Sequence, residues 1–332
     1  MLPEWTRCLG DALAENTSLT TLDLTVNSCF VDADLGEYLG ESLLKSTSLT
    51  SLSLTFSFSN MKEGSECKLG ECLIKMASLT SLSLELNDSS EENQENCLSR
   101  TLSLDDGEEN QENFLNPTEL INVLAAVQSL SSLSVAIHSN SMCSFWDEVV
   151  DDCLIKCTSL KKLSLTLNWG ISDSYCGFSS LLHGLVTTNS LNTLCVAIVI
   201  NDPTDSGSSS VFHSLTQGLP FNSSVTTLTL TVTVAPDETV YISHLINLDH
   251  VLSVNTSITT LNVTINECGD GKSDIPLFLR GFGVFGGLAN NKSVTTFNLT
   301  LNSSKEVSDD WLPGLSDTLK KNTSLTTLRL KE

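Results

Sequence analysis

A short phrase that recurs along the chain constrains the fold more than any other feature of this sequence. Residues 16–27 read NTSLTTLDLTVN, and close copies start at Ser46, Met76, Cys157, Asn255 and Asn322. The first apolar residue of each copy is called the anchor here, and successive anchors lie 30 to 36 residues apart, except for one step of 51. The anchors are Leu19, Leu49, Leu79, Leu130, Leu160, Leu191, Val225, Ile258, Val294 and Leu325. A period of this length is typical of solenoids, in which each repeat is one supersecondary unit.

The spacing of apolar residues within a repeat predicts one helix followed by one strand. Apolar residues follow the anchors at +3, +5 and +7, as in Leu22, Leu24 and Val26, and a period of two is typical of a strand with one buried face. Upstream, apolar residues at −10 and −6, such as Leu9 and Leu13, mark one face of a helix. Stacked repeats of this kind predict a parallel sheet on one side and helices on the other, because a single repeat cannot bury its own leucines.

An asparagine lies three residues before several anchors, between the predicted helix and the predicted strand. These asparagines are Asn16, Asn222, Asn255, Asn291 and Asn322. A helix that ends in a left-handed residue favours glycine or asparagine at that place. We therefore expect them to close the helices in the left-handed conformation.

The repeat resembles a known family. The pattern L-x-x-L-x-L-x-x-N from Leu19 to Asn27 is that of leucine-rich repeats, and the long repeats with a helix are similar to the ribonuclease-inhibitor-like class. Residues 39–55, LGESLLKSTSLTSLSLT, resemble the C-terminal repeat arrays of invertebrate NOD-like receptors. The resemblance covers nearly the whole chain. It implies an α/β leucine-rich repeat solenoid shaped as a horseshoe, with its parallel sheet on the concave face and its helices on the convex face.

The resemblance has two further implications. The first is a single leucine-rich repeat domain, residues 1–332, of about ten repeats. The second concerns the asparagine eight residues after an anchor, which would be buried and would hydrogen-bond the backbone where the chain leaves the strand. These asparagines are Asn27, Asn87, Asn168, Asn266 and Asn302.

The single long step between anchors indicates extra residues at 88–116. The hexapeptide EENQEN occurs there twice, from Glu91 and from Glu108, and Arg100 is the one basic residue among many acidic ones. Leu102 and Leu104 resemble the core of a strand that has no helix before it. The segment is therefore predicted to be an acidic insertion or a degenerate repeat, exposed to solvent. It is also a candidate contact for a basic partner.

The formal net charge of −23 limits the partners of the chain. Nucleic acids and anionic membranes need a basic face, so we expect no nucleic acid and no membrane, whereas a basic protein would be attracted. No run of residues approaches the ~20 apolar residues that span a bilayer. The 11 cysteines are scattered without a clustered framework, which favours reduced thiols and a cytoplasmic protein.

Several N-x-S/T sequons point instead towards a secreted glycoprotein. They lie at Asn16, Asn87, Asn222, Asn255, Asn262, Asn291, Asn298, Asn302 and Asn322. Most coincide with positions where the repeat itself puts asparagine near serine or threonine. Repeat geometry is therefore the favoured explanation, and glycosylation is the alternative.

No motif in the sequence predicts catalysis. Residues 268–273, CGDGKS, approach a phosphate-binding loop but have Asn266 where that loop needs its first glycine. Cys153 and Cys157 would share one helical face, yet no second pair of cysteines or histidines completes a zinc site. The histidines occupy different repeat positions without a catalytic pattern, so we expect no enzyme, no cofactor and no metal.

The strand residues that point away from the core form the predicted binding surface. They follow each anchor at +2, +4 and +6 and are mostly serine and threonine, without the Trp and Tyr anchors of many protein interfaces. The candidate surface consists of Asp23, Thr25, Ser53, Thr55, Ser83, Glu85, Ser134, Ser164, Thr166, Thr229, Thr231, Asn262, Thr264, Asn298 and Thr300. Two interpretations stay open: small residues that suit the sheet and were copied with the repeat, or a polar face for a hydroxyl-rich ligand such as a glycan.

Together these features predict a non-catalytic scaffold that binds a protein or another polar ligand on its concave face or on the loop edge. In the loops that leave the strands, Phe30, Phe58 and Trp169 are candidate anchors for a protein partner. The family resemblance implies the recognition tail of an innate-immune NOD-like receptor, or a relative that kept only the repeats. The alternative is a regulator of an enzyme, either a ribonuclease-inhibitor-like acidic decoy or a GTPase-activating repeat protein.

Overall fold

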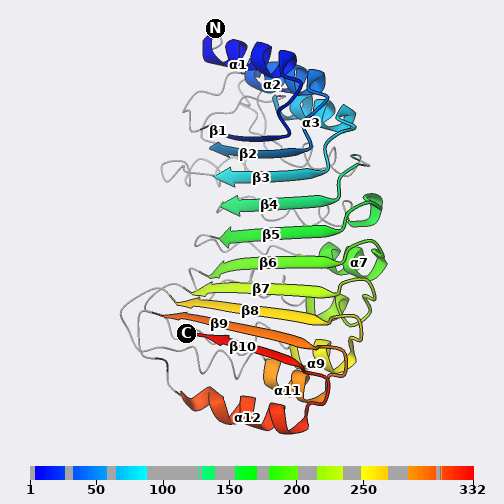
Figure 1. Cartoon of the computed structure of the whole chain (residues 1–332), viewed down its shortest axis with the longest axis vertical. Coiled ribbons are helices and arrows are strands. Elements are labelled where there is room, and N and C mark those ends of the chain that lie inside the picture. The colour runs from blue at the N-terminus through cyan, green and yellow to red at the C-terminus, as the bar shows by residue number, and fades with distance from the viewer. Residues whose placement is uncertain are drawn as a thin grey trace, which may run out of the picture.

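The computed structural model describes residues 4–26, 33–57, 65–87, 127, 129–138, 154–169, 179–200, 215–234, 248–267, 283–303, 307 and 309–332. They contain one ten-stranded sheet whose strands follow one another in chain order, each parallel to its neighbours (Figure 1). The strands are β1 (Thr21–Val26), β2 (Ser51–Ser57), β3 (Ser81–Asn87), β4 (Ser132–His138), β5 (Lys162–Trp169), β6 (Thr193–Ile200), β7 (Thr227–Val234), β8 (Thr260–Glu267), β9 (Thr296–Ser303) and β10 (Thr327–Lys331). Parallel neighbours require the chain to return to the same end of the sheet after every strand, as the repeat predicts.

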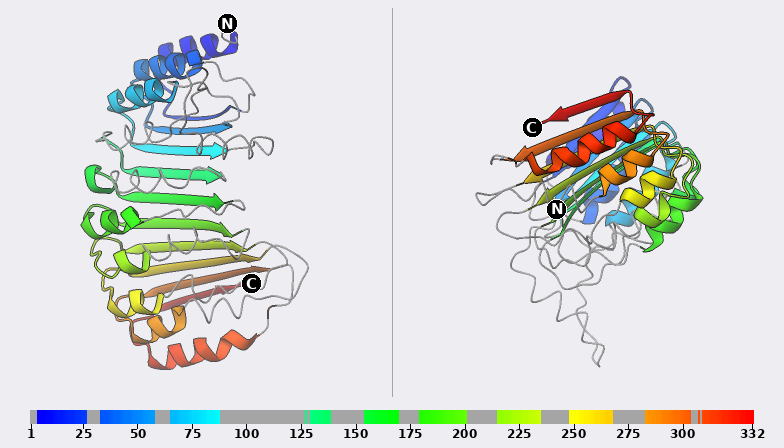
Figure 2. Two further views of the ribbon diagram at one scale, coloured as in Figure 1. Left: turned by 180° about the vertical axis from the view of Figure 1, so that it is seen from behind. Right: turned by 90° about the horizontal axis from the view of Figure 1, so that it is seen from below.

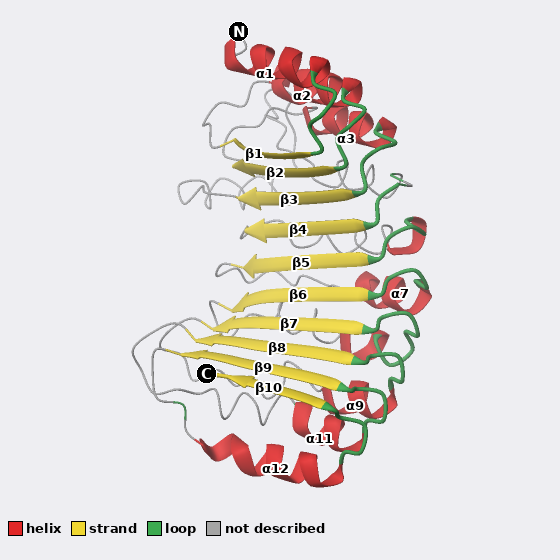
Figure 3. Cartoon of the chain, in the orientation of Figure 1, coloured by secondary structure: helices red, strands yellow, loops and turns green. Residues whose placement is uncertain are grey.

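Helices precede the strands and lie on one side of the sheet. The helices described over their full length are α1 (Glu4–Glu15), α2 (Ala33–Lys45), α3 (Ser65–Lys75), α7 (Ser179–Thr187), α9 (Leu248–Val254), α11 (Val284–Asn290), the 3-10 helix η4 (Asp309–Trp311) and α12 (Leu312–Lys321), and residues 154–156 and 215–218 are also helical. Figure 3 distinguishes helices from strands, and the right panel of Figure 2 shows them as two layers. The face of the sheet turned away from these helices is called the open face from here on.

Equivalent leucines stand side by side across the sheet. Leu22 pairs with Leu52, and Leu52 with Leu82, in the register that the repeat spacing predicts. Leu52 and Leu82 are each 1% exposed, whereas Ser53 and Ser83 beside them are only half-buried. Each strand therefore turns its aliphatic side chains inward and its hydroxyls outward, and every fully buried leucine contributes about 1.5–3 kcal/mol.

Burial of the leucines depends on the neighbouring repeats. Leu22 in β1 has one neighbouring strand and is half-buried, whereas Leu52 in β2 has two and is 1% exposed. At the other end of the sheet, Leu330 in β10 is 46% exposed while its register partner Leu299 in β9 is 1% exposed. This behaviour is that of a quasi-one-dimensional solenoid, whose stability comes from contacts between adjacent repeats.

Glycines bring adjacent helices into close contact. A Cβ added at Gly40 of α2 would lie 2.7 Å from the Sγ of Cys72 in α3, and one at Gly287 of α11 would lie 2.7 Å from the Cβ of Leu252 in α9. Atoms do not approach so closely, so a side chain at either glycine would push the helices apart. The helices thus stack in step with the strands, and the chain is the α/β leucine-rich repeat solenoid that its sequence predicts.

The long step between anchors does not interrupt the sheet. Strands β3 and β4 pair directly, from Ser81 with Ser132 to Asn87 with His138, although these residues are separated by the long step. Residues 88–116, the predicted acidic insertion or degenerate repeat, lie outside the described residues. The register is therefore the same before and after them.

Asn291 and Asn322, two of the asparagines before the strands, do not have the predicted left-handed conformation. Asn291 and Asn322 have φ of −70° and −72° with ψ of 142° and 133°, which is extended backbone. The Oδ1 of Asn291 accepts hydrogen bonds from the second and third backbone N–H groups after it, and its Nδ2 donates to two carbonyls of the preceding repeat. Asn222, Asn255 and Asn322 repeat this pattern. The left-handed prediction was wrong because a local side-chain turn and the neighbouring repeat together satisfy these groups in the extended form.

Asn266 and Asn302, two of the asparagines eight residues after the anchors, are not the buried backbone partners that the family resemblance implies. Asn168 and Asn266 are half-buried on the open face, and Asn302 is exposed. The Nδ2 of Asn266 donates to a threonine hydroxyl of β7 at 3.0 Å, and the Nδ2 of Asn302 donates to the Oδ1 of Asn266 at 2.8 Å. Strands β8 and β9 extend beyond this position, so the alternation of the strand carries these side chains outward. Asn87 ends β3, and Asn27 lies outside the described residues.

Candidate functional site

The structure places every residue of the candidate binding surface on the open face, in two adjacent rows. The row at +4 contains Asp23, Ser53, Ser83, Ser134, Ser164, Cys195, Thr229, Asn262, Asn298 and Arg329. The row at +6 contains Thr25, Thr55, Glu85, Ala136, Thr166, Ala197, Thr231, Thr264, Thr300 and Lys331. All are half-buried or exposed. Strand neighbours within a row are about 4.8 Å apart, so the rows form one continuous surface, and its role in binding stays a prediction.

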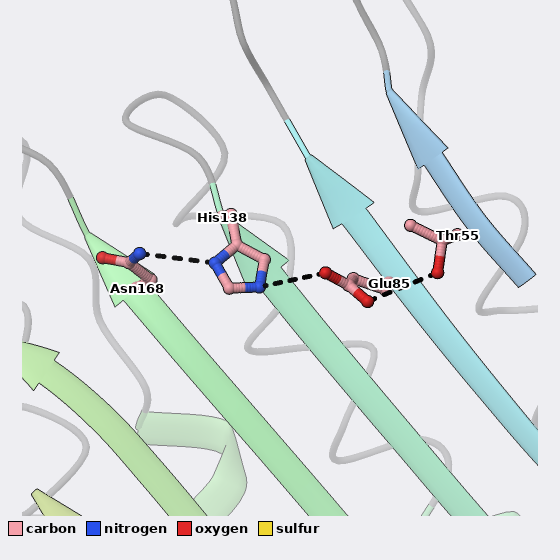
Figure 4. A network of polar contacts seen from close by, with 4 residues as sticks. All are labelled: Thr55, Glu85, His138 and Asn168. Atoms are coloured by element: carbon pink, nitrogen blue, oxygen red, sulfur yellow. Dashed lines mark hydrogen bonds and ion pairs between the residues drawn. The ribbon is translucent and has the colours of Figure 1, made fainter. Parts of the chain in front are cut away.

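A chain of polar contacts crosses β2 to β5 on the open face (Figure 4). The hydroxyl of Thr55 donates to Oε2 of Glu85 at 3.3 Å, and Oε1 of Glu85 lies 3.7 Å from Nε2 of His138. On the other side of the ring, Nδ1 of His138 lies 3.3 Å from Nδ2 of Asn168. Four consecutive strands thus contribute one residue each to this network.

The network orients Glu85 and His138 towards each other. An amide nitrogen can only donate, so Nδ1 of His138 is the acceptor in the contact with Asn168, and Nε2 is the ring nitrogen that faces the carboxylate of Glu85. The side chains of His138 and Glu85 are 32% and 43% exposed, so a ligand on the open face can reach both. Sequence reasoning missed His138 because it belongs to no motif. Its position eight residues after Leu130 is the signal that would have placed it on this face.

Two ladders of asparagine side chains cross β7 to β9. In the row at +4, Nδ2 of Asn298 donates to Oδ1 of Asn262 at 2.6 Å, and Nδ2 of Asn262 donates to the hydroxyl of Thr229 at 2.9 Å. In the row at +8, Asn302 and Asn266 repeat this arrangement and end on a threonine of β7. Both ladders run in the same direction, because each amide donates to the preceding repeat. Sequence reasoning found the row at +4 but assigned the row at +8 to the interior.

The predicted loop anchors are only partly described. Phe30 and Phe58 lie outside the described residues. Trp169 is the last residue of β5, where its backbone is in register with Ile200 of β6. The acidic segment 88–116 also lies outside the described residues. Contacts of these residues with a partner therefore stay predictions.

Outside the open face, the described residues contain no candidate metal site. In this part of the chain, no group of three or more histidine, cysteine, aspartate or glutamate side chains is placed to hold a metal ion. Cys157 is 0% exposed and packs in the core, while Cys153 and residues 268–273 lie outside the described part. None of the described helices is both long and apolar enough to cross a bilayer. The open face is therefore the strongest candidate site.

Comparisons with known proteins do not assign the fold, which is assigned from the repeats of this chain. No protein-family model matches the sequence, and no curated protein matches it. Among solved structures, the chain is similar to the tropomodulin C-terminal domain of Caenorhabditis elegans, with 15% identity and a TM-score of 0.32 over 48% of this chain and 82% of that one. It is also similar to internalin C2 of Listeria monocytogenes, with 14% identity and a TM-score of 0.28 over 95% and 77% of the two chains. Similarities of this size carry no argument about function. The class, a leucine-rich repeat solenoid, follows from the in-register strands and their helices.

Proposed function

We propose that the chain is a non-catalytic scaffold that binds a protein or another polar ligand on the open face. The supporting observation is the unbroken register of outward side chains across ten strands. At about 4.8 Å per strand and about 6.7 Å per outward residue, this surface measures about 43 Å by 20 Å. An area of about 800 Å² on each partner is typical of a stable protein complex. The open face is therefore large enough for one macromolecular partner.

We further propose that the chain folds in the cytoplasm, and its sequons support this. Asn222, Asn255 and Asn291 are each 3% exposed. In each, Nδ2 donates two hydrogen bonds to carbonyls of the preceding repeat. A glycan attached to Nδ2 would remove a donor and would need space that the core does not have. These sequons are compatible with the fold only where they are not glycosylated.

The N-x-S triplets have a structural role that accounts for their recurrence. The serine that follows Asn255 by two residues, Ser257, donates its hydroxyl to the carbonyls of Asn222 and Val225 in the preceding repeat. Ser324 contacts the carbonyls of Asn291 and Val294 in the same way, and Ser293 donates to the carbonyl of Asn255. Asparagine and serine together therefore tie each of these repeats to the one before it, which supports the interpretation of the sequons as repeat geometry.

The biological setting that we propose is the recognition tail of an innate-immune NOD-like receptor or a repeat-only relative. The support is the resemblance of residues 39–55 to those repeat arrays. The second candidate is a regulator of an enzyme, since a net charge of −23 suits an acidic decoy for a basic protein. A GTPase-activating repeat protein, the other form of this candidate, would act through an exposed arginine or asparagine such as Arg329, which is exposed on β10.

Affinity capture with matched variants tests the proposed binding surface. The open-face variant carries Ser83→Arg and Ser134→Arg, and the control carries Gln217→Arg and Ser253→Arg at exposed positions on the helical side. Both variants add the same charge. We expect a partner from the source cells to bind the wild type and the control but not the open-face variant. A partner that binds all three chains equally would refute the open face as the site.

The salt dependence of the captured complex separates the two candidate functions. Binding of a basic protein by an acidic decoy should weaken steeply between about 0.05 and 0.5 M salt, because attraction between exposed charges is screened. Recognition through the hydroxyl-rich open face should change little over this range. Loss of the complex at high salt, with no effect of the open-face substitutions, would favour the decoy.

A further inference from the structure

Three neighbouring strands of the open face, β7 to β9, differ in chemistry from the strands on either side of them. Strands β1 to β5 carry Asp23, Glu85, His138 and Lys162 among their outward residues, and β10 carries Arg329 and Lys331. On β7 to β9, every outward residue from +2 to +8 is a threonine or an asparagine. These residues, called the Thr/Asn platform, are Thr227, Thr229, Thr231, Thr233, Thr260, Asn262, Thr264, Asn266, Thr296, Asn298, Thr300 and Asn302. The platform is uncharged, although the chain has a net charge of −23.

The four asparagines of the platform are already held by hydrogen bonds before any ligand arrives. The two ladders hold Asn262, Asn298, Asn266 and Asn302 by amide hydrogen bonds of 2.6 to 3.0 Å. Each ladder amide in β8 uses one N–H and one lone pair and keeps a second of each. Side chains fixed in this way lose little further conformational entropy when a ligand binds.

One acceptor of the platform lacks a partner. The Oδ1 of Asn298, at the open end of its ladder, is buried and has no hydrogen-bond partner among the described residues. Most buried polar atoms in proteins are paired, and an unpaired one needs an explanation. Because this oxygen is buried, a ligand on the open face does not reach it, and the groups offered to a ligand are those of the half-buried threonines and of Asn262, Asn266 and Asn302.

The platform also has an apolar border. On β6, the outward residues Cys195, Ala197 and Val199 are half-buried, and they stand in register with Thr229, Thr231 and Thr233. A ligand that lies across β6 to β9 therefore contacts a narrow apolar strip on β6 and many hydrogen-bond donors and acceptors on β7 to β9. A sugar ring has this pair of surfaces, with hydroxyls on its edge and C–H groups on its face.

We propose that the Thr/Asn platform binds an uncharged oligosaccharide lying across β7 to β9. Hydroxyls both donate and accept, which matches threonine hydroxyls and ladder amides. The platform itself offers no cation to an acidic saccharide, although Arg329 and Lys331 of β10 lie beside it. The platform residues lack the Trp, Tyr and Arg side chains that dominate protein interfaces, which disfavours a protein at this place. The inference rests on the proposed binding role of the open face and names the chemistry of one part of it.

Calorimetric titration with neutral hexasaccharides tests the proposal. The probes are cellohexaose, laminarihexaose, maltohexaose and chitohexaose, and the comparison is an acidic oligogalacturonide. We expect at least one neutral probe to bind with a dissociation constant of about 1 mM or tighter. Its affinity should be unchanged in about 0.5 M salt, because neither partner surface is charged. The acidic probe should bind more weakly than the best neutral probe, and any binding through Arg329 and Lys331 should disappear in about 0.5 M salt.

The matched variants remove hydroxyls without changing shape. Thr231→Val, Thr264→Val and Thr300→Val together should weaken binding at least about tenfold, since each lost hydrogen bond is worth a factor of about two to ten. The control, Thr25→Val with Thr166→Val, changes the same row outside the platform and should bind as the wild type does. Thermal melting of both variants checks their folding, and Asn302→Ala at an exposed position is a second platform variant.

Two results would overturn the inference. The first is the absence of binding by all neutral probes at about 10 mM, well above the expected dissociation constant. The second is binding that the folded platform variants retain in full. If a protein partner is captured on the open face while no saccharide binds, the proposed scaffold function stands and the inference about the platform falls.

Discussion

Replacing one buried asparagine, Asn255→Ala, tests the new role that the structure gives to the residue before each strand. Asn255 is 3% exposed and lies between α9 and β8. Its Nδ2 donates to the carbonyls of Leu219 at 2.7 Å and Asn222 at 2.9 Å, and its Oδ1 accepts from the backbone N–H of Ser257 and of Ile258, each at 2.9 Å. Alanine leaves all of these backbone groups without the amide.

The size of the effect follows from the groups that lose a partner. A buried donor or acceptor left unpaired costs about 1–3 kcal/mol, and water that enters the vacated space recovers part of this loss. We therefore expect Asn255→Ala to lower the free energy of unfolding by about 3–4 kcal/mol. Asn255→Asp keeps the acceptor but places a carboxylate against two carbonyl oxygens, so it should be at least as destabilising near neutral pH.

Urea unfolding measures this effect, with Asn302→Ala as the matched control. Asn302 is also an asparagine at the edge of a repeat, but it is exposed and donates one hydrogen bond, to Asn266. Its replacement should cost about 0.5–1 kcal/mol. The slope of the unfolding curve shows whether the transition stays cooperative. The reasoning fails if Asn255→Ala is within about 1 kcal/mol of the wild type, or if Asn302→Ala costs as much.

Three other predictions concern packing and compartment. Leu163→Ala should lower the free energy of unfolding by about 2–5 kcal/mol as a core cavity, and wild-type melting would contradict the register. Gly287→Ala should cost about 1–3 kcal/mol because its Cβ would lie 2.9 Å from the Cα of Asp249. Gly286→Ala, whose Cβ would meet only the side chain of Asp249, is the control for that comparison by thermal melting. A chain directed into the secretory pathway should be glycosylated at buried sequons and retained unfolded, and secretion of a folded, fully glycosylated form would contradict this expectation.

The register of the sheet could be predicted residue by residue because two periods in the sequence agree. The anchor spacing places Leu22, Leu52 and Leu82 at the same point of successive repeats, and the period of two decides which side chains face inward. A shift by one residue would turn every leucine outward, so the apolar pattern leaves one register. The register is the same on both sides of the long step before Leu130.

The roles of the two sets of asparagines could not be predicted, because each depends on another repeat. From its own segment alone, Asn291 could either end a helix or hydrogen-bond to another repeat. The carbonyls of the preceding repeat, which accept from its Nδ2, decide between these roles. Asn266 was assigned to the interior because the strand was expected to end there, but β8 continues to Glu267.

The polar network of the candidate site could not be predicted from the sequence either, because it also joins residues of different repeats. Glu85 and His138 come from repeats on either side of the long step and meet only because β3 and β4 pair directly. Their contact depends on the diagonal placement of the rows at +6 and +8, which requires the sheet. Sequence reasoning placed Glu85 on the surface but had no signal for its partner.

An arginine scan of β8, with the free energy of unfolding as the readout, tests the central claim most directly. The claim is that each strand commits one set of residues to the core and leaves the alternate set available to a ligand. Arginine at Leu261, Val263 or Ile265, each at most 1% exposed, should cost at least about 3 kcal/mol or abolish folding. Arginine at Thr260 or Thr264 should cost about 1 kcal/mol or less. A uniform loss along the strand, or the opposite alternation, would contradict the account.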